Sequence, residues 1–216
     1  MTAILHNTDY KDARSLVGNG TCDLVILHPP FVENDSDYVL TTTDALHIAH
    51  NKLKEDGIAV IIQHDKKKQF APPRHALLIY DALALGWQVY GQKIWHRQKT
   101  VNLFRHTFGY VTILAKGEPK VGKYLKEITQ EYHQDVWFFA DTMRRGKFKD
   151  AFPLELPKRL IKGFTPENGV VLDLFAGVGT TLVAANALGR SSIGFEIDAN
   201  LAEHWSKDIT VVPRNA

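Results

Sequence analysis

The chain has 216 residues, of which 44% are hydrophobic and 23% are charged, a size and composition typical of one globular domain. A single cysteine, Cys22, excludes an internal disulfide framework and favours a reducing compartment such as the cytoplasm. No apolar run approaches the roughly 18 residues that a membrane-spanning helix needs, and the first residues lack the pattern of a signal peptide. The formal net charge of +2 neither indicates nor excludes an acidic partner, so local motifs must indicate the function.

Short apolar runs alternate with amphipathic stretches in the first half of the chain, as in a largely parallel α/β sheet. Residues 23–27 predict a strand buried on both faces, and the two prolines after His28 end it. The pattern then predicts a helix over 43–54, a strand over 58–62 and a helix over 72–86.

The second half begins with two β segments, 87–95 and 110–114, with no full helix between them. They predict an antiparallel hairpin at a sheet edge. Residues 116–150 show no clear period, and we interpret them as a small insertion or target-recognition segment within a single domain over 1–216. The remaining expected elements are a helix over 154–164, a strand over 170–175, a helix over 180–188, a strand over 192–197 and a helix over 198–207.

The richest motif is the strand, turn and helix over 173–181, in which Gly177 and Gly179 let backbone N–H groups approach a ligand closely. Glu196 ends the next strand, where a carboxylate can accept hydrogen bonds from both hydroxyls of a ribose. An ordinary βαβ turn and a dinucleotide site are the alternatives. The dinucleotide fingerprint is incomplete, because Leu182 replaces its third glycine.

The run from Asp173 to Thr181, followed by Ile193-Gly194-Phe195-Glu196-Ile197-Asp198, resembles the S-adenosylmethionine-binding region of amino-methyltransferases that act on DNA bases. The resemblance implies a doubly wound α/β fold with a mostly parallel, seven-stranded, Rossmann-like sheet and one antiparallel edge strand. It implies S-adenosyl-L-methionine as cofactor, with an acid near the adenine and another on the ribose. We also expect the carboxylate of Asp173 to accept N–H groups from beneath the turn. The implied cofactor-binding residues are Asp9, Asp173, Phe175, Ala176, Gly177, Gly179, Thr180, Thr181, Glu196 and Asp198.

The second motif of that family is Asp, Asn or Ser, then Pro-Pro and an aromatic residue at the end of a strand, which His28-Pro29-Pro30-Phe31 resembles. These four residues are the candidate catalytic residues. A rigid turn would present a side-chain acceptor and a backbone carbonyl to an exocyclic amino group, while Phe31 stacks on a base rotated out of the helix. A strand-ending Pro-Pro with a core Phe is the alternative reading. His28 departs from the family, since a neutral imidazole offers one acceptor nitrogen and a protonated one offers none.

The catalytic motif precedes the cofactor motif, as in the circularly permuted class of this family. The resemblance therefore implies methyl transfer to the exocyclic amino group of a DNA base, with adenine N6 first and cytosine N4 as the alternative. An inactive nucleic-acid-binding subunit, which His28 favours, and an RNA methyltransferase stay open. Because the insertion is short, a homodimer or a partner subunit could share recognition.

Clusters of basic residues with aromatic residues between them suit phosphate contacts, although a solvated face is the commoner explanation for any one cluster. We expect nucleic-acid contacts at Lys66, Lys67, Lys68, Arg97, Lys99 and Arg105, with Trp95 and Phe104 interleaved. The spacing of the histidines fits no zinc motif, so no metal site is expected.

Overall fold

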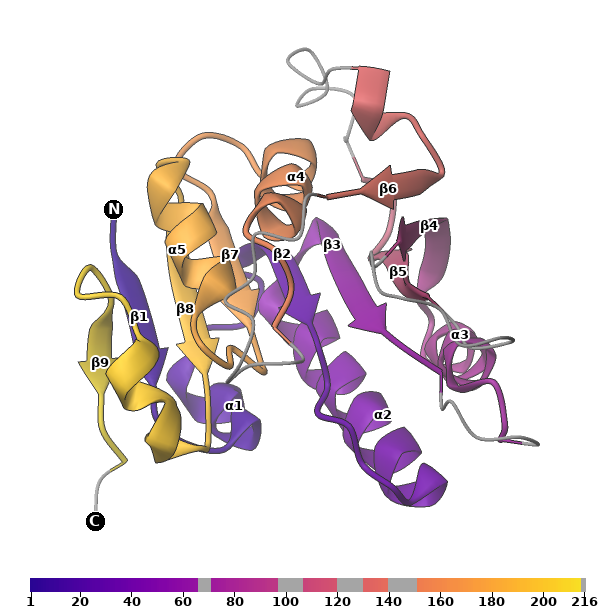
Figure 1. The fold of residues 1–216 in the computed structure, drawn as a ribbon, viewed down its shortest axis with the longest axis horizontal. Coiled ribbons are helices and arrows are strands. Elements are labelled where there is room, and N and C mark those ends of the chain that lie inside the picture. The colour runs from indigo at the N-terminus through magenta and orange to yellow at the C-terminus, as the bar shows by residue number, and fades with distance from the viewer. Residues whose placement is uncertain (66–70, 97–106, 120–129, 140–150, 215–216) are drawn as a thin grey trace.

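The computed structural model describes residues 1–65, 71–96, 107–119, 130–139 and 151–214, and these form one α/β structure built on a single sheet. Its strands are β1 (Ala3–His6), β2 (Cys22–Leu27), β3 (Leu53–Gln63), β4 (Gln88–His96), β5 (Phe108–Ala115), β6 (Val136–Phe138), β7 (Val170–Asp173), β8 (Ser191–Phe195) and β9 (Thr210–Val212). The described strands lie in the order β6-β4-β5-β3-β2-β7-β8-β1-β9 (Figure 1).

The sheet confirms the doubly wound, mostly parallel fold and corrects two details. The described part of the chain forms nine strands where the resemblance implied seven. No predicted helix or strand covers β1, and none covers the edge strands β6 and β9. Both are three residues long, too short for a hydrophobic period to indicate them. The hairpin of β4 and β5 is confirmed, but β5 alone among the described strands runs antiparallel, and it lies inside the sheet between β3 and β4.

Helices cover both faces of the sheet (Figure 1). Those of α type are α1 (Ala13–Leu16), α2 (Asp35–Lys52), α3 (Arg74–Ala84), α4 (Glu155–Phe164) and α5 (Thr180–Ala187), and the 3-10 turns are η1 (Tyr10–Asp12), η4 (Gln130–Tyr132) and η5 (Ala199–His204). The α1, α2 and α3 helices bury side chains in one core cluster, and α4 and α5 do so in another. Among the described residues, no helix has both the length and the apolar character that crossing a membrane requires.

Two predicted elements begin several residues earlier than expected, and one predicted helix is of another type. The second helix begins at Asp35 rather than residue 43, because the Asn34 side chain accepts from the N–H groups of Ser36 and Asp37 and caps it. The β3 strand begins at Leu53 rather than residue 58, and a register shift against β2 accommodates the extra residues. The stretch after Asp198 forms a short 3-10 turn instead of an α-helix.

The side chains of β2 alternate between the two cores, which fixes this strand in the middle of the sheet. Leu24 and Ile26 face the core under α4 and α5, whereas Val25 and Leu27 face the core under α1, α2 and α3. The carboxyl ends of the parallel strands β2, β3, β7 and β8 lie along one edge, where open α/β sheets bind ligands.

Candidate active site

The turn after β7 has the backbone geometry that the glycine motif predicts. Gly177 and Gly179 adopt left-handed conformations with φ of 54° and 81°, and Gly179 is the N-cap of α5. A β-carbon at either position would be strained, so glycine suits both. A β-carbon built on Gly177 would meet no atom within 4 Å, so this face of the turn is open.

Glu196 spans this turn and the end of β8. Its Oε2 accepts from the Gly177 N–H at 2.8 Å, and its Oε1 accepts from the Asp198 N–H at 2.8 Å. The Asn7 side chain donates to the Glu196 carbonyl at 2.8 Å, which ties the end of β8 to β1. The half-buried Glu196 carboxylate is thereby oriented by backbone groups on two sides, and each oxygen keeps a further acceptor position.

Asp173 supports the turn from below. Its side chain is 1% exposed, and Oδ1 accepts from the Phe175 N–H at 2.9 Å, as expected from the sequence. Burial raises the pKa of Asp173 to about 6, against the opposing effects of the Thr181 hydroxyl and the Phe175 amide. The Thr181 hydroxyl, itself buried, lies near this carboxyl without reaching hydrogen-bond geometry. Asp173 and Thr181 therefore lie beneath the turn rather than on its open face.

The other residues implied to bind cofactor surround the same turn. Phe175 packs on the Tyr10 ring with centroids 4.9 Å apart, and Ala176 donates its N–H to the Phe195 carbonyl at 2.8 Å. Thr180 is the first residue of α5. Asp9, which follows β1, caps η1, and Asp198, which follows β8, caps η5. Because β1 and β8 are parallel neighbours, these acids lie at the same edge of the sheet as Glu196.

The predicted catalytic tetrapeptide lies at the same edge, on the adjacent strand. Ile26 of β2 pairs with Asp173 of β7, so the residues that follow each strand are neighbours. The His28 ring meets the ring of Phe152 edge-on at 5.4 Å between centroids. Pro29 is buried, whereas Phe31 is 61% exposed. The structure thus places an imidazole and an exposed aromatic ring beside the glycine turn.

A second histidine, His64, lies opposite His28 and was not expected from the sequence. It follows β3, and its ring is perpendicular to that of His28, with centroids 6.3 Å apart. Its Nδ1 lies 3.2 Å from the carbonyl of Phe108, and its ring packs on Trp95. A β-carbon at Gly109 would lie 2.3 Å from the His64 ring, so any side chain there would force this ring to shift. The signal that the sequence offered was its position directly after a strand that ends at the ligand-binding edge.

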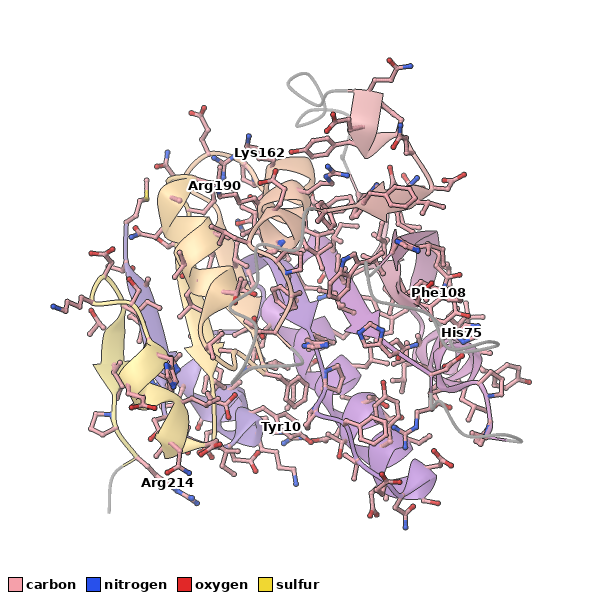
Figure 2. The ribbon with its side chains drawn as sticks, viewed as in Figure 1. Tyr10, His75, Phe108, Lys162, Arg190 and Arg214 are labelled. Atoms are coloured by element: carbon pink, nitrogen blue, oxygen red, sulfur yellow. The ribbon has the colours of Figure 1, made fainter. Side chains whose placement is uncertain are left out.

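A separate pair of titratable groups lies beyond β3. The Nδ1 of His75 is 2.6 Å from Oδ2 of Asp65, and the His75 backbone N–H donates to the same carboxylate. The His75 ring stacks on Tyr110 at 3.8 Å, and Figure 2 shows His75 and Phe108 near one another. Burial and the charge of Asp65 raise the pKa of Tyr110. This pair links the start of α3 to the hairpin.

The predicted nucleic-acid contacts Lys66, Lys67, Lys68, Arg97, Lys99 and Arg105 lie outside the described residues. Trp95, expected among them as an interleaved aromatic, is 5% exposed and packs on His64, so it does not lie on the surface. Lys93, on the same strand, pairs with Asp135 at 2.8 Å and thus helps to join β4 to β6.

The family assignment follows from sequence comparison. Residues 22–207 match a profile of the N6/N4 amino-methyltransferases, described as DNA methylases. Because the match covers most of the chain, the protein belongs to this family.

Individual relatives agree with this class over shorter stretches or at lower identity. The type II methyltransferase M.MjaI of Methanocaldococcus jannaschii is 37% identical over 106 residues, which is 43% of this chain and 35% of the relative. The chain spans less than half the length of this relative and of two others, the type II methyltransferases M.MthZI of Methanothermobacter thermautotrophicus and M.BglI of Bacillus subtilis. The matches cover 34% to 46% of the three relatives.

Two solved structures share the fold. TTHA0409 of Thermus thermophilus, described as a candidate DNA modification methylase and crystallised with S-adenosyl-L-methionine, superposes with a TM-score of 0.81 at 22% identity, over 100% of both chains. The cytosine-N4-specific PvuII DNA methyltransferase superposes with a TM-score of 0.76 at 19% identity, covering 92% of this chain and 83% of that one.

Proposed function

We propose that the chain binds S-adenosyl-L-methionine on the open face of the turn after β7. Glu196 would accept hydrogen bonds from the ribose hydroxyls, because backbone N–H groups already orient both of its oxygens. Asp9 and the exposed Ile197, at the ends of neighbouring strands, would flank the adenine. Asp173 would hold the turn in shape through Phe175. The open space beside Gly177 fits a ligand here. TTHA0409, which shares the fold, was crystallised with this cofactor.

We further propose that the protein transfers a methyl group to the exocyclic amino group of a DNA base. The observation that carries this proposal is the pairing of Ile26 with Asp173, which puts the tetrapeptide and the glycine turn side by side. When bound, the cofactor would supply an electrophilic methyl group on a sulfonium centre, which would be left as a neutral thioether once its bond to that methyl group breaks. A neutral His28 would accept one proton of the amino group in a hydrogen bond, and a carbonyl of the Pro29-Pro30 turn would accept the other. This orientation directs the nitrogen lone pair at the methyl group, and the nitrogen then loses a proton to solvent.

Phe31 would stack on the target base once it is rotated out of the duplex. Its exposure of 61% supports this role, since a ring that only filled the core would be buried. Adenine N6 is our first choice of target and cytosine N4 the alternative, and the cytosine-N4-specific PvuII enzyme shares the fold. The aromatic residue is compatible with both bases.

An inactive nucleic-acid-binding subunit is the second candidate, and His28 is the observation that favours it. In that case, the chain would bind cofactor or DNA without transferring a methyl group. An RNA target is the further alternative for an active enzyme.

Incubation with methyl-labelled cofactor and unmodified DNA, followed by nucleoside analysis, tests the proposal. We expect label in N6-methyl-2′-deoxyadenosine, and label in N4-methyl-2′-deoxycytidine would instead select the alternative base. A parallel incubation with unmodified RNA tests the other substrate class. Absence of label from both nucleic acids, with cofactor binding intact by calorimetry, would support the inactive subunit and contradict the proposed activity.

A further inference from the structure

A buried cation lies directly behind the predicted catalytic loop. Arg74, the first residue of α3, is 1% exposed. Its Nε donates to Oδ1 of Asp35 at 2.8 Å, and its Nη2 donates to the carbonyl of Val32. Its Nη1 is buried and has no hydrogen-bond partner among the described residues. The guanidinium therefore joins the start of α3 to the segment between β2 and α2.

The same guanidinium lies over two aromatic rings that differ in exposure. Its Cζ is 4.3 Å from the ring centroid of Tyr38, which is 4% exposed, and 5.3 Å from that of Phe31, which is 61% exposed. Tyr38 is fixed in turn by a hydrogen bond from its hydroxyl to Gln63 at 2.9 Å. Arg74 thus connects an exposed ring on an irregular loop to a ring held rigidly in the core.

The energetics indicate that this cation does more than fill space. Burying a guanidinium is costly, and a well-packed apolar side chain of similar volume often stabilises a core as well or better. Only a planar fork, however, can donate to a carboxylate and a loop carbonyl while it stacks on two rings. Two of these contacts, with Val32 and Phe31, lie in the loop between β2 and α2, and the other two, with Asp35 and Tyr38, tie that loop to the first turn of α2.

We propose that Arg74 is a positioning residue that holds the Phe31 ring in the orientation needed to stack on the target base. The cation contacts one part of the ring, and the exposed part remains accessible to a base. The role of Phe31 in this proposal rests on the proposed methyltransferase function, whereas the control of its orientation by Arg74 does not.

A double-mutant cycle tests whether Arg74 acts through Phe31. Arg74→Met keeps most of the side-chain volume but removes the charge and the fork. We expect it to slow single-turnover methylation by about tenfold or more, since small misplacements of a reacting geometry are costly. Cofactor affinity should stay within about twofold of wild type, because the cofactor turn lies on other strands. In the Phe31→Ala background, Arg74→Met should cause less than about a threefold further loss.

Two results of this cycle would overturn the proposal. One is wild-type turnover in the Arg74→Met variant. The other is a double mutant whose loss equals the product of the two single losses, which indicates independent roles. Arg74→Lys keeps the charge but loses the planar fork, so its turnover should fall between those of wild type and Arg74→Met. It replaces Arg74→Met if that variant does not fold.

A spectroscopic readout separates this inference from the proposed function. A trifluoromethyl-phenylalanine placed at position 31 reports the ring environment in the free protein by fluorine NMR. We expect one sharp resonance with Arg74 and a shifted, broadened resonance with Arg74→Met, even if no nucleic acid is methylated. An unchanged resonance would contradict the positioning role.

Lys52→Met is the matched control for loss of a buried cation. Lys52 is 3% exposed and donates to the carbonyls of Arg14 and Val17 and to the side chain of Asn19. It ends α2, about 26 Å from Asp35 at 1.5 Å per residue. Lys52→Met should lower stability but leave the fluorine resonance unchanged. A matching change in both variants would show that general destabilisation, not Arg74, moves the ring.

Discussion

The two halves of the candidate site are built differently. Around the glycine turn, backbone N–H groups donate to carboxylates, and Glu196 and Asp173 each hold a particular part of the turn. Around His28, the side chains that meet its ring are His64 and Phe152, and the ring of His64 packs in turn on Trp95. Phe31, three residues further along the same loop, lies under the guanidinium of Arg74. The residues of the first half match the sequence pattern of the family. The second half contains His28, where the family pattern has Asp, Asn or Ser.

This difference indicates where the protein tolerates change. A turn stabilised by backbone hydrogen bonds depends on few side-chain identities, so a short motif describes it. A site made of packed rings depends on long-range contacts, and an unusual residue there is compatible with the fold if its neighbours accommodate it.

The largest effect that we expect in the cofactor half is from Glu196→Ala. Loss of the carboxylate removes the ribose acceptors and leaves the N–H groups of Gly177 and Asp198 without this partner. Binding of S-adenosylmethionine should weaken by about 1–3 kcal/mol, which calorimetric titration measures. Glu167→Ala, an exposed glutamate at the opposite end of β7, is the control and should bind as wild type does. Equal affinities for the two variants would remove Glu196 from the cofactor site.

The matching test in the catalytic half is Gly109→Ala. The added methyl group would displace the His64 ring, which we expect to cost about 1–3 kcal/mol of stability and to slow turnover. Cofactor affinity should not change, because the glycine turn lies on other strands. Gly91→Ala, on the paired strand β4, has open space for a β-carbon and should leave turnover unchanged. Equal turnover in wild type and Gly109→Ala would show that His64 has no part in the site.

Asp173→Asn tests the support beneath the turn through the pH dependence of stability. The folded-state pKa of Asp173, about 6, lies above its ordinary value of 3.8, so the folded protein retains a proton that the unfolded chain releases. The free energy of unfolding should therefore fall as pH rises from about 4 to 6, by up to about 3 kcal/mol in total. Asp173→Asn removes this loss, so its stability relative to wild type should be greater at pH 7.5 than at pH 4.5 in urea unfolding of the cofactor-free protein.

Asp135 should affect the pH dependence of stability in the opposite direction to Asp173, and Asp135→Asn tests this by the same urea unfolding. The hydrogen bond from Lys93 lowers the pKa of this exposed carboxyl, so its stabilising effect is lost as pH falls. If Asp173→Asn has the same pH dependence as wild type, the carboxyl of Asp173 is not perturbed by burial.

The smallest expected effect concerns the basic triplet outside the described residues. Changing Lys66, Lys67 and Lys68 to Ala should weaken DNA binding for every sequence alike and reduce the slope of log affinity against log salt by about 0.9 for each phosphate that is no longer neutralised. Lys162→Ala is the control, since this exposed lysine of α4 lies at the far edge of the sheet from the candidate site (Figure 2). An unchanged salt slope in the triple variant would place the DNA-binding face elsewhere.

The sequence predicts the central strands and most of the glycine turn, because their signals are local. Buried strands such as β2 and β7 are continuous apolar runs, and Gly177 and Gly179 are needed for the backbone itself. The edge strand β9 and the first turns of α2 escape such analysis, since one is short and the other depends on the Asn34 cap within a polar stretch.

His64 and Arg74 could not be assigned to the catalytic half from the sequence. These two residues contact the catalytic half only because distant segments of the chain pack together. Arg74 contacts Phe31 although α2 and β3 separate them in the sequence, and His64 meets His28 because β2 and β3 are paired strands. The periodicity of hydrophobic residues does not indicate contacts between segments that are distant in the sequence.

The most direct test of the account is single-turnover methylation of unmodified DNA by wild type, His28→Ala and His28→Asn across pH. If a neutral His28 accepts from the amino group, wild type should be active and should slow at acidic pH as the imidazole is protonated. His28→Ala should bind cofactor normally but transfer no methyl group, and His28→Asn should remain active without the acidic loss. An active His28→Ala enzyme with a flat pH profile would contradict the central role of His28, and a silent wild type beside an active His28→Asn variant would identify an inactive subunit.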